Sequence, residues 1–525
     1  MACWVQLMFV ASAWLAMGQG LPIRGTEFDL AAAVRTACAS SSPARIDIPA
    51  GRHVLQTPIE INQTCSAASL SLVGEAGAIV DGGIALGAWS PQPNQPGIFT
   101  ASVPPSYPGQ ALQLWIGDER IPLARSPTMI WEQIAMVVYE SWTASVHQIA
   151  HIDASNNNIS VINPIPSRWL SGGTSGASGQ RYYVQNAREY VVAGSGYFFH
   201  DATQGLIFYA PIDGAAPQVT GYVALLPSLL SVSQFAHLNV SNVIFEHNRA
   251  DLGLCFQSTC SSQAGDGRYG LLQFAHAQDV NLNNITVRHA GSYGVAFFGG
   301  CVDVALTHSK VHDVGFGAVR AGAAAGGVPA PTDPAATGVI ITDNNFFDGS
   351  HIIRDGLVVK GQAINVAESV SCCSFAVRRR AGCGVLMQAA NNSRVSHNMI
   401  RDFDYTGVSI GWTWNYIPTG KKDLLGFPQP QGECVLGPYA DLLPCVRLAN
   451  TNNIVSYNHI ENIGRRQLSD MGCVYHLGES PGTVISNNVC INVTSFNYGG
   501  WGYYLDRKSM PPAVAVLIAF FSPPA

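Results

Sequence analysis

A short apolar–polar pattern that contains asparagine recurs along the second half of the chain. It reads Val395-Ser-His-Asn398-Met-Ile400, Val455-Ser-Tyr-Asn458-His-Ile460 and Ile485-Ser-Asn-Asn488-Val-Cys490. Looser copies cover residues 280–285 and 341–346, and the copy over 306–311 has Ser309 in place of asparagine. The marked positions 283 and 309 lie 26 residues apart, and 458 and 488 lie 30 apart. A period of this size indicates stacked, similar units.

Each copy has the chemistry of a short strand followed by a bend. Valine and isoleucine alternate with polar residues, so successive side chains point to opposite faces. Asparagine suits the bend because it tolerates left-handed backbone and bonds to its own main chain. Helical patterns are scarce, apart from a short one over 28–38. We predict an all-β fold, a parallel β-helix, with a β-sandwich or a propeller as the alternative.

The first residues have the composition of an export signal. Residues 1–20 contain an apolar stretch from Val5 to Met17, and Ala16 and Gly18 fit a cleavage site with small residues. The stretch is too short to span a bilayer with margin. We predict a secretory signal peptide and a secreted, extracellular protein, with a buried hydrophobic helix as the alternative. No run of eighteen apolar residues follows, so we expect no stable membrane span.

Composition divides the rest of the chain into four parts. We assign residues 21–112 to N-terminal β-helix coils, because strand patterns alternate there with Gly and Pro. In residues 113–226 the asparagine pattern disappears and aromatic residues increase, which predicts an inserted antiparallel β subdomain. Residues 227–510 are expected to form the main parallel β-helix with an active-site groove. Residues 511–525 form an apolar tail that differs from the sequence before it.

Charge and cysteine content narrow the partners and the compartment. A net charge of −6 offers no cationic surface for nucleic acid. Removal of Cys3 with the signal leaves twelve cysteines, an even number that suits disulfides in an oxidising compartment. Cys255 with Cys260, and Cys434 with Cys445, are candidate pairs, but spacing leaves the connectivity open. N-x-Ser/Thr sequons, which suggest a glycoprotein, occur at Asn62, Asn158, Asn239, Asn284, Asn391 and Asn492.

No metal or cofactor is expected from the motifs. The cysteines at 372, 373 and 383 lack paired C-x2-C units, so the pattern does not favour zinc. The chemistry-bearing residues are instead carboxylates and aromatics, the set that binds and cleaves sugars.

Two aspartates near the C-terminus are the candidate catalytic pair. Asp470 follows the Asn458 bend by 12 residues, and Asp506 follows the Asn488 bend by 18. If residues 495–500 loop outward, both carboxylates fall on the same side of adjacent coils, whose strands lie about 4.8 Å apart. Such a pair can protonate a glycosidic oxygen and attack or activate water. The alternative is that each aspartate caps a turn through its own backbone.

Aromatic and polar residues around this pair are the predicted substrate contacts. Aromatic faces bind the apolar faces of sugar rings, and Tyr or Trp keeps a polar end. Arg320 would bind an acidic sugar or pair with a carboxylate; a structural ion pair is the alternative. For Trp414, packing under a loop is an equal alternative. The predicted substrate-binding residues are Tyr405, Trp412, Tyr475, His476, Trp501, Tyr504 and Arg320.

These segments resemble the right-handed β-helix proteins of glycoside hydrolase family 141 and its pectate-lyase-like relatives. The most specific part is Leu468-Ser-Asp-Met-Gly472, then 480–488, then Tyr498-Gly-Gly-Trp-Gly-Tyr-Tyr-Leu-Asp506. Weaker similarity covers 113–125, 313–320 and 405–412. The resemblance implies a right-handed β-helix and an exo-glycosidase acting on cell-wall or extracellular polysaccharide, fucosidase- or xylanase-like. It implies that Asp470 and Asp506 are the catalytic acids, without assigning which is the proton donor.

The sequence also departs from this family and leaves other functions open. The family carries acidic, glycine or small polar residues after the final aspartate, whereas Arg507-Lys-Ser-Met510 and the apolar tail stand here. We therefore expect a C-terminally truncated product whose activity is in doubt. A polysaccharide lyase or uronate epimerase is one alternative; it needs a cation and a base, for which Arg401, Asp402 and Asp404 are faint candidates. A non-catalytic carbohydrate-binding protein is the other.

Overall fold

The computed structural model describes residues 28–124, 135–139, 144–153, 158–161, 181–250, 269–322, 335–351, 365–367, 382–411, 450–478, 480–506, 513–515 and 518–520. The predicted signal peptide, Trp412, Trp414 and the cysteines at 255, 260, 372, 373, 434 and 445 lie outside these residues.

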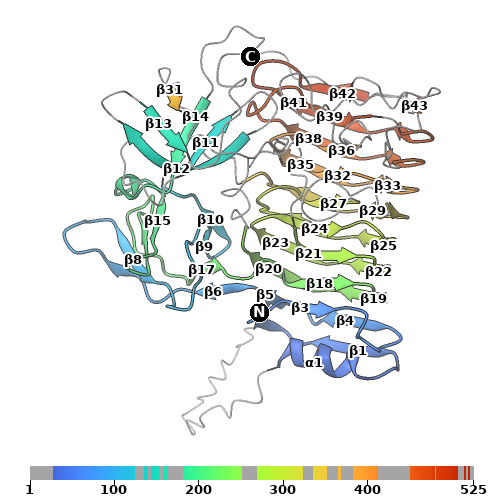
Figure 1. The fold of residues 1–525 in the computed structure, drawn as a ribbon, viewed down its shortest axis with the longest axis horizontal. Coiled ribbons are helices and arrows are strands. Elements are labelled where there is room, and N and C mark those ends of the chain that lie inside the picture. The colour runs from blue at the N-terminus through green and yellow to red at the C-terminus, as the bar shows by residue number, and fades with distance from the viewer. Residues whose placement is uncertain are drawn as a thin grey trace, which may run out of the picture.

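Three long parallel sheets run side by side along the molecule (Figure 1). Sheet A contains β1 (Ala44–Ile48), β4 (Leu70–Gly74), β19 (Ala236–Ser241), β22 (Gln278–Asn283), β25 (Val302–Thr307), β29 (Ile340–Thr342), β34 (Arg394–Ser396), β37 (Ile454–Ser456), β40 (Val484–Ser486) and β43 (Ala513–Ala515), with β28 (Ala336–Thr337) and β33 (Ala390–Asn391) beside it. Sheet B contains β2 (Gly51–Val54), β5 (Ala78–Asp81), β20 (Ile244–Asn248), β23 (Thr286–Ala290), β26 (Lys310–His312), β30 (Asn345–Phe347), β35 (Met399–Phe403), β38 (His459–Ile463), β41 (Val489–Val493) and β44 (Ile518–Phe520). Sheet C contains β3 (Ile59–Ile61), β18 (Leu230–Ser233), β21 (Gly270–Ala275), β24 (Tyr293–Phe297), β27 (Val319–Ala321), β32 (Val385–Met387), β36 (Val408–Ile410), β39 (Gly472–His476) and β42 (Trp501–Leu505).

The chain visits sheets A, B and C in turn, so each circuit is one coil of a right-handed parallel β-helix. This confirms the predicted fold class. The coils bury Val, Ile, Leu and Phe in one continuous core. The helix α1 (Leu30–Cys38) packs against the first coil and is capped by Asp29, whose Oδ1 accepts from the Ala32 amide at 2.9 Å. Among the described residues, no helix is long and apolar enough to cross a membrane.

The recurring asparagines form a buried ladder between sheets A and B. The Oδ1 atom of Asn458 accepts hydrogen bonds from the amide and the side chain of Asn398, at 3.1 and 2.9 Å. Its own Nδ2 donates to the Val395 carbonyl at 2.9 Å. Asn488 binds Asn458 in the same way, and Asn398 binds Asn344. The ladder explains the sequence pattern: each asparagine satisfies buried main-chain groups of the neighbouring coil.

A second stacked column lies at the C-terminal ends of the sheet B strands, and the sequence pattern did not predict it. The register places one residue with positive φ at the same position of seven coils. These residues are His247, His289, Asp313, Asp348, Asp402, Asn462 and Asn492. Asn, Asp and His are the non-glycine residues that adopt this conformation most often. Asn occupies this position only in the last two of the seven coils. The mixture of residue types therefore leaves no single-residue pattern in the sequence.

Antiparallel strands project from one coil of the β-helix, between β5 and β18. They form a sheet of β6 (Gly83–Ala85), β9 (Leu114–Ile116), β10 (Glu119–Ile121) and β17 (Gly221–Ala224), and another of β7 (Ser90–Pro91), β8 (Phe99–Ser102), β15 (Phe198–Asp201) and β16 (Leu206–Tyr209). A third contains β11 (Ala135–Tyr139), β12 (Ala144–Asp153), β13 (Asn158–Val161), β14 (Arg181–Gln185) and the parallel β31 (Asn365–Ala367); the 3-10 helix η2 spans Arg188–Tyr190. An antiparallel unit is thus present, and its strands begin at Gly83, earlier in the chain than residue 113.

Two disulfides are present in the described residues. Cys38–Cys65 ties α1 to the first coil, and Cys473–Cys490 links β39 of sheet C to β41 of sheet B. Cys301 and Cys383 form no disulfide, and both thiols are buried.

Candidate active site

Asp470 lies in the bend that precedes β39. Its backbone is left-handed, with φ of 57°, and its amide donates to the Tyr498 carbonyl at 2.9 Å. Its Oδ1 accepts from the hydroxyl of Tyr504 at 3.0 Å. Burial raises the pKa of the Asp470 carboxyl, and the charge of Asp506 acts in the same direction, against the hydrogen bond from Tyr504. The carboxyl group therefore holds its proton to a higher pH than an exposed aspartate does.

Asp506 directly follows β42. Its amide donates to the His476 carbonyl at 3.0 Å, which continues the pairing of β39 with β42 by one residue. Its Oδ2 accepts from the hydroxyl of Tyr475 at 2.8 Å. Tyr475 is buried, and burial together with Tyr405 and Asp506 raises its pKa. The tyrosine thus stays protonated and orients the carboxylate of Asp506.

The two aspartates lie at opposite ends of one pair of neighbouring strands. Gly472 pairs with Trp501 and His476 pairs with Leu505, so the whole paired segment separates the two backbones. We expected both carboxylates at the same side of adjacent coils; the register instead places their backbones at opposite ends of the strand pair. Each carboxylate binds a tyrosine of the strand pair, and the charge of Asp506 acts on Asp470.

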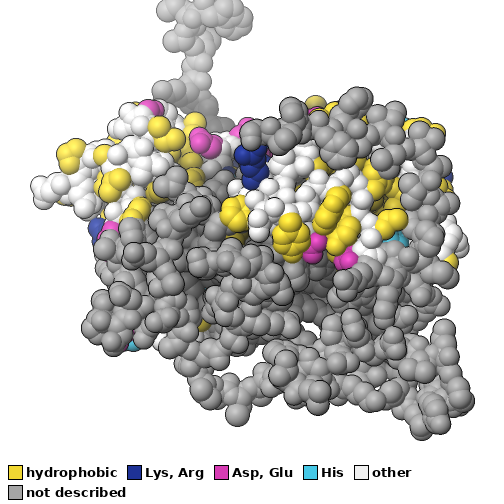
Figure 2. Space-filling model, turned by 90° about the horizontal axis from the view of Figure 1, so that it is seen from above, with side chains coloured by type: hydrophobic (Ala, Val, Ile, Leu, Met, Phe, Trp, Pro, Cys, Tyr) yellow, Lys and Arg dark blue, Asp and Glu magenta, His cyan; other side chains and the backbone are white. Residues whose placement is uncertain are grey.

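A row of aromatic rings connects the two carboxylates with the surface. The Trp501 and Tyr504 ring centroids lie 4.3 Å apart, those of Tyr504 and Tyr475 lie 4.8 Å apart, and those of Tyr475 and Tyr405 lie 6.2 Å apart. The row runs from the exposed Trp501 to the fully buried Tyr405. Figure 2 shows hydrophobic side chains next to acidic ones over this end of the β-helix. Four of the predicted substrate-binding residues therefore lie together beside the aspartates.

His476 and Arg320 differ in position from that group. Successive side chains of a strand alternate between faces, so His476 points away from the face of Tyr475. It is fully buried, and burial lowers its pKa to about 4. Arg320 is also fully buried, with its guanidinium over the Phe298 ring at 5.4 Å.

The register places Arg320 on the same face as Tyr475, three strands away. At one strand spacing per step, the two backbones lie about 14 Å apart. Arg320 therefore reaches a different part of the outer face of sheet C from the two aspartates. Trp412 lies outside the described residues.

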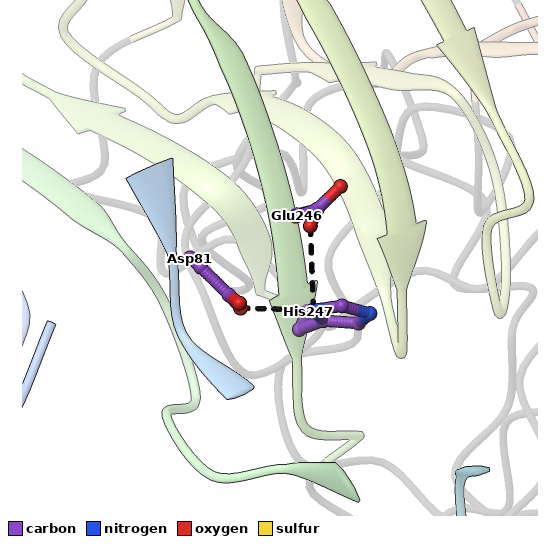
Figure 3. A group of neighbouring side chains, drawn as sticks. All are labelled: Asp81, Glu246 and His247. Atoms are coloured by element: carbon purple, nitrogen blue, oxygen red, sulfur yellow. Dashed lines mark hydrogen bonds and ion pairs between the residues drawn. The ribbon is translucent and has the colours of Figure 1, made fainter. Parts of the chain in front are cut away.

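A second cluster of titratable residues lies where the antiparallel strands meet sheet B (Figure 3). His247 Nδ1 lies 2.8 Å from Asp81 Oδ1 and 3.8 Å from Glu246 Oε1, and all three residues are buried. Their ligand atoms are close enough for one metal ion. However, Arg52 binds both carboxylates, and Arg288 Nε donates to Glu246 Oε2 at 2.7 Å. The guanidinium groups already supply the positive charge, so the residues fit a buried ion-pair network better than a metal site.

Asp313 is the centre of a similar network. Trp115 Nε1 donates to its Oδ2 at 2.7 Å, and Arg120 of β10 binds its Oδ1. His289 Nδ1 lies 2.7 Å from the same carboxyl group, and His351 Nε2 lies 3.2 Å from it. Burial opposes ionisation of Asp313, but Arg120 and the histidines outweigh it and hold the pKa well below its usual value. The network joins the antiparallel strands to the β-helix. Sequence reasoning missed it, because its members are far apart in the chain.

A comparison with one solved structure supports the fold. The structure is similar to a solved structure described as "Glycoside hydrolase", with a TM-score of 0.64 and 15% sequence identity, over 89% of this chain and 85% of that chain. It also matches "The complex structure of XylC with xylose" (TM-score 0.42, 11% identity, 90% of this chain and 64% of that chain). A tailspike protein, gp49 from Pseudomonas phage LKA1, matches with a TM-score of 0.27 and 12% identity, over 94% and 73% of the two chains. No family model matches the sequence, and no curated protein matches it.

Proposed function

We propose that this protein is a glycoside hydrolase that cleaves a glycosidic bond in an extracellular polysaccharide, with Asp470 and Asp506 as its catalytic carboxyl groups. The observation that carries the proposal is the pairing of each aspartate with a tyrosine hydroxyl on two adjacent strands. Two carboxyl groups in different environments are what glycoside cleavage requires, because one must donate a proton while the other is ionised.

The environments suggest the division of roles. Burial and the nearby charge raise the pKa of Asp470, so it is the proton donor to the leaving oxygen. Asp506 accepts a hydrogen bond from Tyr475, which directs its carboxylate toward the sugar as the base or nucleophile. The aromatic row beside them suits the apolar face of a pyranose. In the reaction Asp470 gives its proton to the departing oxygen, water supplies the new hydroxyl on the cleaved sugar, and the proton that this water loses goes to a carboxylate of the pair.

We further propose membership of a group like glycoside hydrolase family 141, with fucosidase- or xylanase-like activity. Support comes from the 468–506 motifs, in which each aspartate accepts a hydrogen bond from a tyrosine of the same strand pair. We also propose that the protein is secreted. The two disulfides and the apolar segment over residues 1–20 suit an oxidising compartment.

A hydrolysis screen tests the proposal. The full chain is expressed through a secretory route and tested on xylan, fucosylated xyloglucan and pectin, with reducing-sugar detection. We expect Asp470→Asn and Asp506→Asn each to lower kcat/KM at least a hundredfold, whereas Asp279→Asn, on the exposed surface, leaves it unchanged. Full activity of either active-site variant contradicts the assigned roles. Release of an unsaturated sugar that absorbs in the ultraviolet would instead identify a lyase.

A further inference from the structure

An exposed aromatic segment lies directly beside Asp470. Among the described side chains, four aromatics are exposed: Tyr457 (56%), Phe496 (48%), Tyr498 (40%) and Trp501 (41%). Three of these four fall within six consecutive residues. Exposed aromatic area costs free energy in water, and a cluster of it marks a surface that binds something.

The main chain fixes this segment to the residues that carry Asp470. The Phe496 amide donates to the Leu468 carbonyl at 2.8 Å, and the Asn497 amide donates to Ser469 Oγ at 3.1 Å. The Tyr498 carbonyl accepts from the Asp470 amide at 2.9 Å. The segment therefore runs along 468–471 at hydrogen-bonding distance, which positions its rings before any ligand arrives.

Glycine permits this close approach. Gly499 has φ of 88°, and a Cβ atom there would lie 2.8 Å from the Asp470 nitrogen and 3.0 Å from the Trp501 ring. A side chain at this position would push the segment away from Asp470. The absence of one lets Tyr498 and Trp501 flank the bend that carries the aspartate.

The exposed rings are continuous with the candidate active site. The tilted rings of Trp501 and Tyr504 pack with their centroids 4.3 Å apart, and the Tyr504 hydroxyl donates to Asp470. Burial raises the pKa of Tyr504, and Tyr498 is among the neighbouring groups that add to this shift. Tyr498 thus lies near Tyr504 at the exposed end of the row, and Phe496 belongs to the same exposed segment.

We infer that Phe496 and Tyr498 form a second sugar-binding subsite, so that the substrate is an oligosaccharide or polysaccharide with at least two contacted rings. The inference rests on the proposed function. Rings of exposed Phe and Tyr offer stacking area with few polar demands, which suits the C–H face of a pyranose. The first sugar ring contacts the aspartates, Trp501 and Tyr504. The next ring of the saccharide stacks on Phe496 and Tyr498.

Chain-length dependence of hydrolysis tests the subsite. The full chain is assayed on 4-nitrophenyl β-xyloside, xylobiose and xylotriose, and on 4-nitrophenyl α-L-fucoside and a fucosylated xyloglucan oligosaccharide. We expect Phe496→Ala/Tyr498→Ala to lower the ratio of kcat/KM for the oligosaccharide to that for the aryl glycoside about tenfold, as two lost stacking contacts predict. Tyr457→Ala removes an exposed aromatic ring that stacks on His397 in another bend, and should leave the ratio unchanged. An unchanged ratio in the double variant overturns the inference.

Binding separates this inference from the proposed function. If the wild type hydrolyses neither series, the proposed function fails, and titration calorimetry with the same sugars judges the subsite alone. Weaker oligosaccharide binding by the double variant supports the subsite, and equal binding, or no binding by the wild type, overturns it. Sedimentation provides the last check. If the wild type sediments as a dimer, the double variant sediments as a monomer and both bind sugar equally, the segment is an interface between two copies. This result also overturns the inference.

Discussion

The hydroxyl group of Tyr504 lies 3.0 Å from Oδ1 of Asp470. Tyr504 belongs to β42, which pairs with β39, the strand that Asp470 precedes. A donor to a carboxylate favours the ionised form, whereas burial favours the protonated form. At Asp470 burial dominates and the pKa is raised, with Tyr504 limiting the shift. The tyrosine therefore limits how far the pKa of Asp470 rises above that of an exposed aspartate.

Tyr504→Phe should move the basic limb of the pH–activity profile upward. Loss of the hydroxyl removes the hydrogen bond that lowers the pKa of Asp470, so the carboxyl keeps its proton to a higher pH. We expect the basic limb of the kcat/KM profile to shift by about one pH unit, since a hydrogen bond to a charged group contributes about 1.5 kcal/mol and one pH unit corresponds to about 1.4 kcal/mol. The matched control is Tyr503→Phe, whose hydroxyl donates to the Asn488 carbonyl at 3.0 Å. A downward shift in Tyr504→Phe would contradict the assignment of Asp470 as the acid.

Asn458→Ala should destabilise the β-helix by about 2–6 kcal/mol. The substitution leaves the buried Asn398 amide without its acceptor and the Val395 carbonyl without its donor, and each costs about 1–3 kcal/mol. Urea unfolding followed by circular dichroism measures the change. Asn281→Ala, at an exposed position of β22, should change stability by less than about 0.5 kcal/mol. Equal midpoints for the two variants would show that the ladder contributes nothing specific.

Asp313→Asn should weaken the attachment of the antiparallel strands to the β-helix. It should also change how the free energy of unfolding depends on pH in the acidic range. Removal of one buried charge leaves Arg120 unpaired, which costs about 3–5 kcal/mol at neutral pH. The folded-state pKa of Asp313 is depressed, so its stabilising effect is present above the unfolded value near 4 and is lost as pH falls toward the folded value. Thermal unfolding from pH 7 to pH 3 should therefore show the gap between wild type and variant narrowing below about pH 4. A gap independent of pH rules out a charge effect.

Cys301 and Cys383 should resist alkylation in the folded protein. Both are buried, and burial raises the pKa of Cys301 to about 11 and of Cys383 to about 12. At pH 8 almost no thiolate forms, and thiolate is the reactive species. Iodoacetamide treatment followed by peptide mapping should find both thiols unmodified in native protein and modified in 6 M guanidinium chloride. Rapid native modification would show that the coil around them opens.

Part of this architecture was predictable from residue spacing and part was not. The asparagines at 398, 458 and 488 marked the coil bends correctly, because one residue type performs one hydrogen-bonding task in each. The left-handed position at the ends of the sheet B strands was not predicted, because His, Asp and Asn all occupy it. Spacing also suggested equivalent positions for Asp470 and Asp506, whereas the register places them at opposite ends of β39 and β42. The sequence named Tyr475 and Tyr504 as substrate contacts, but their hydrogen bonds to Asp506 and Asp470 depend on strand pairing, which a single sequence does not specify.

The asparagine ladder has a consequence for how such a molecule can diversify. Successive rungs are separated by 54, 60 and 30 residues, yet each makes the same contacts with the one before it. The alignment of the coils thus does not depend on the number of residues between successive rungs. The segments between rungs can lengthen, shorten or be exchanged during evolution while the coils stay aligned. New binding specificities can therefore arise in these segments without changes to the buried core.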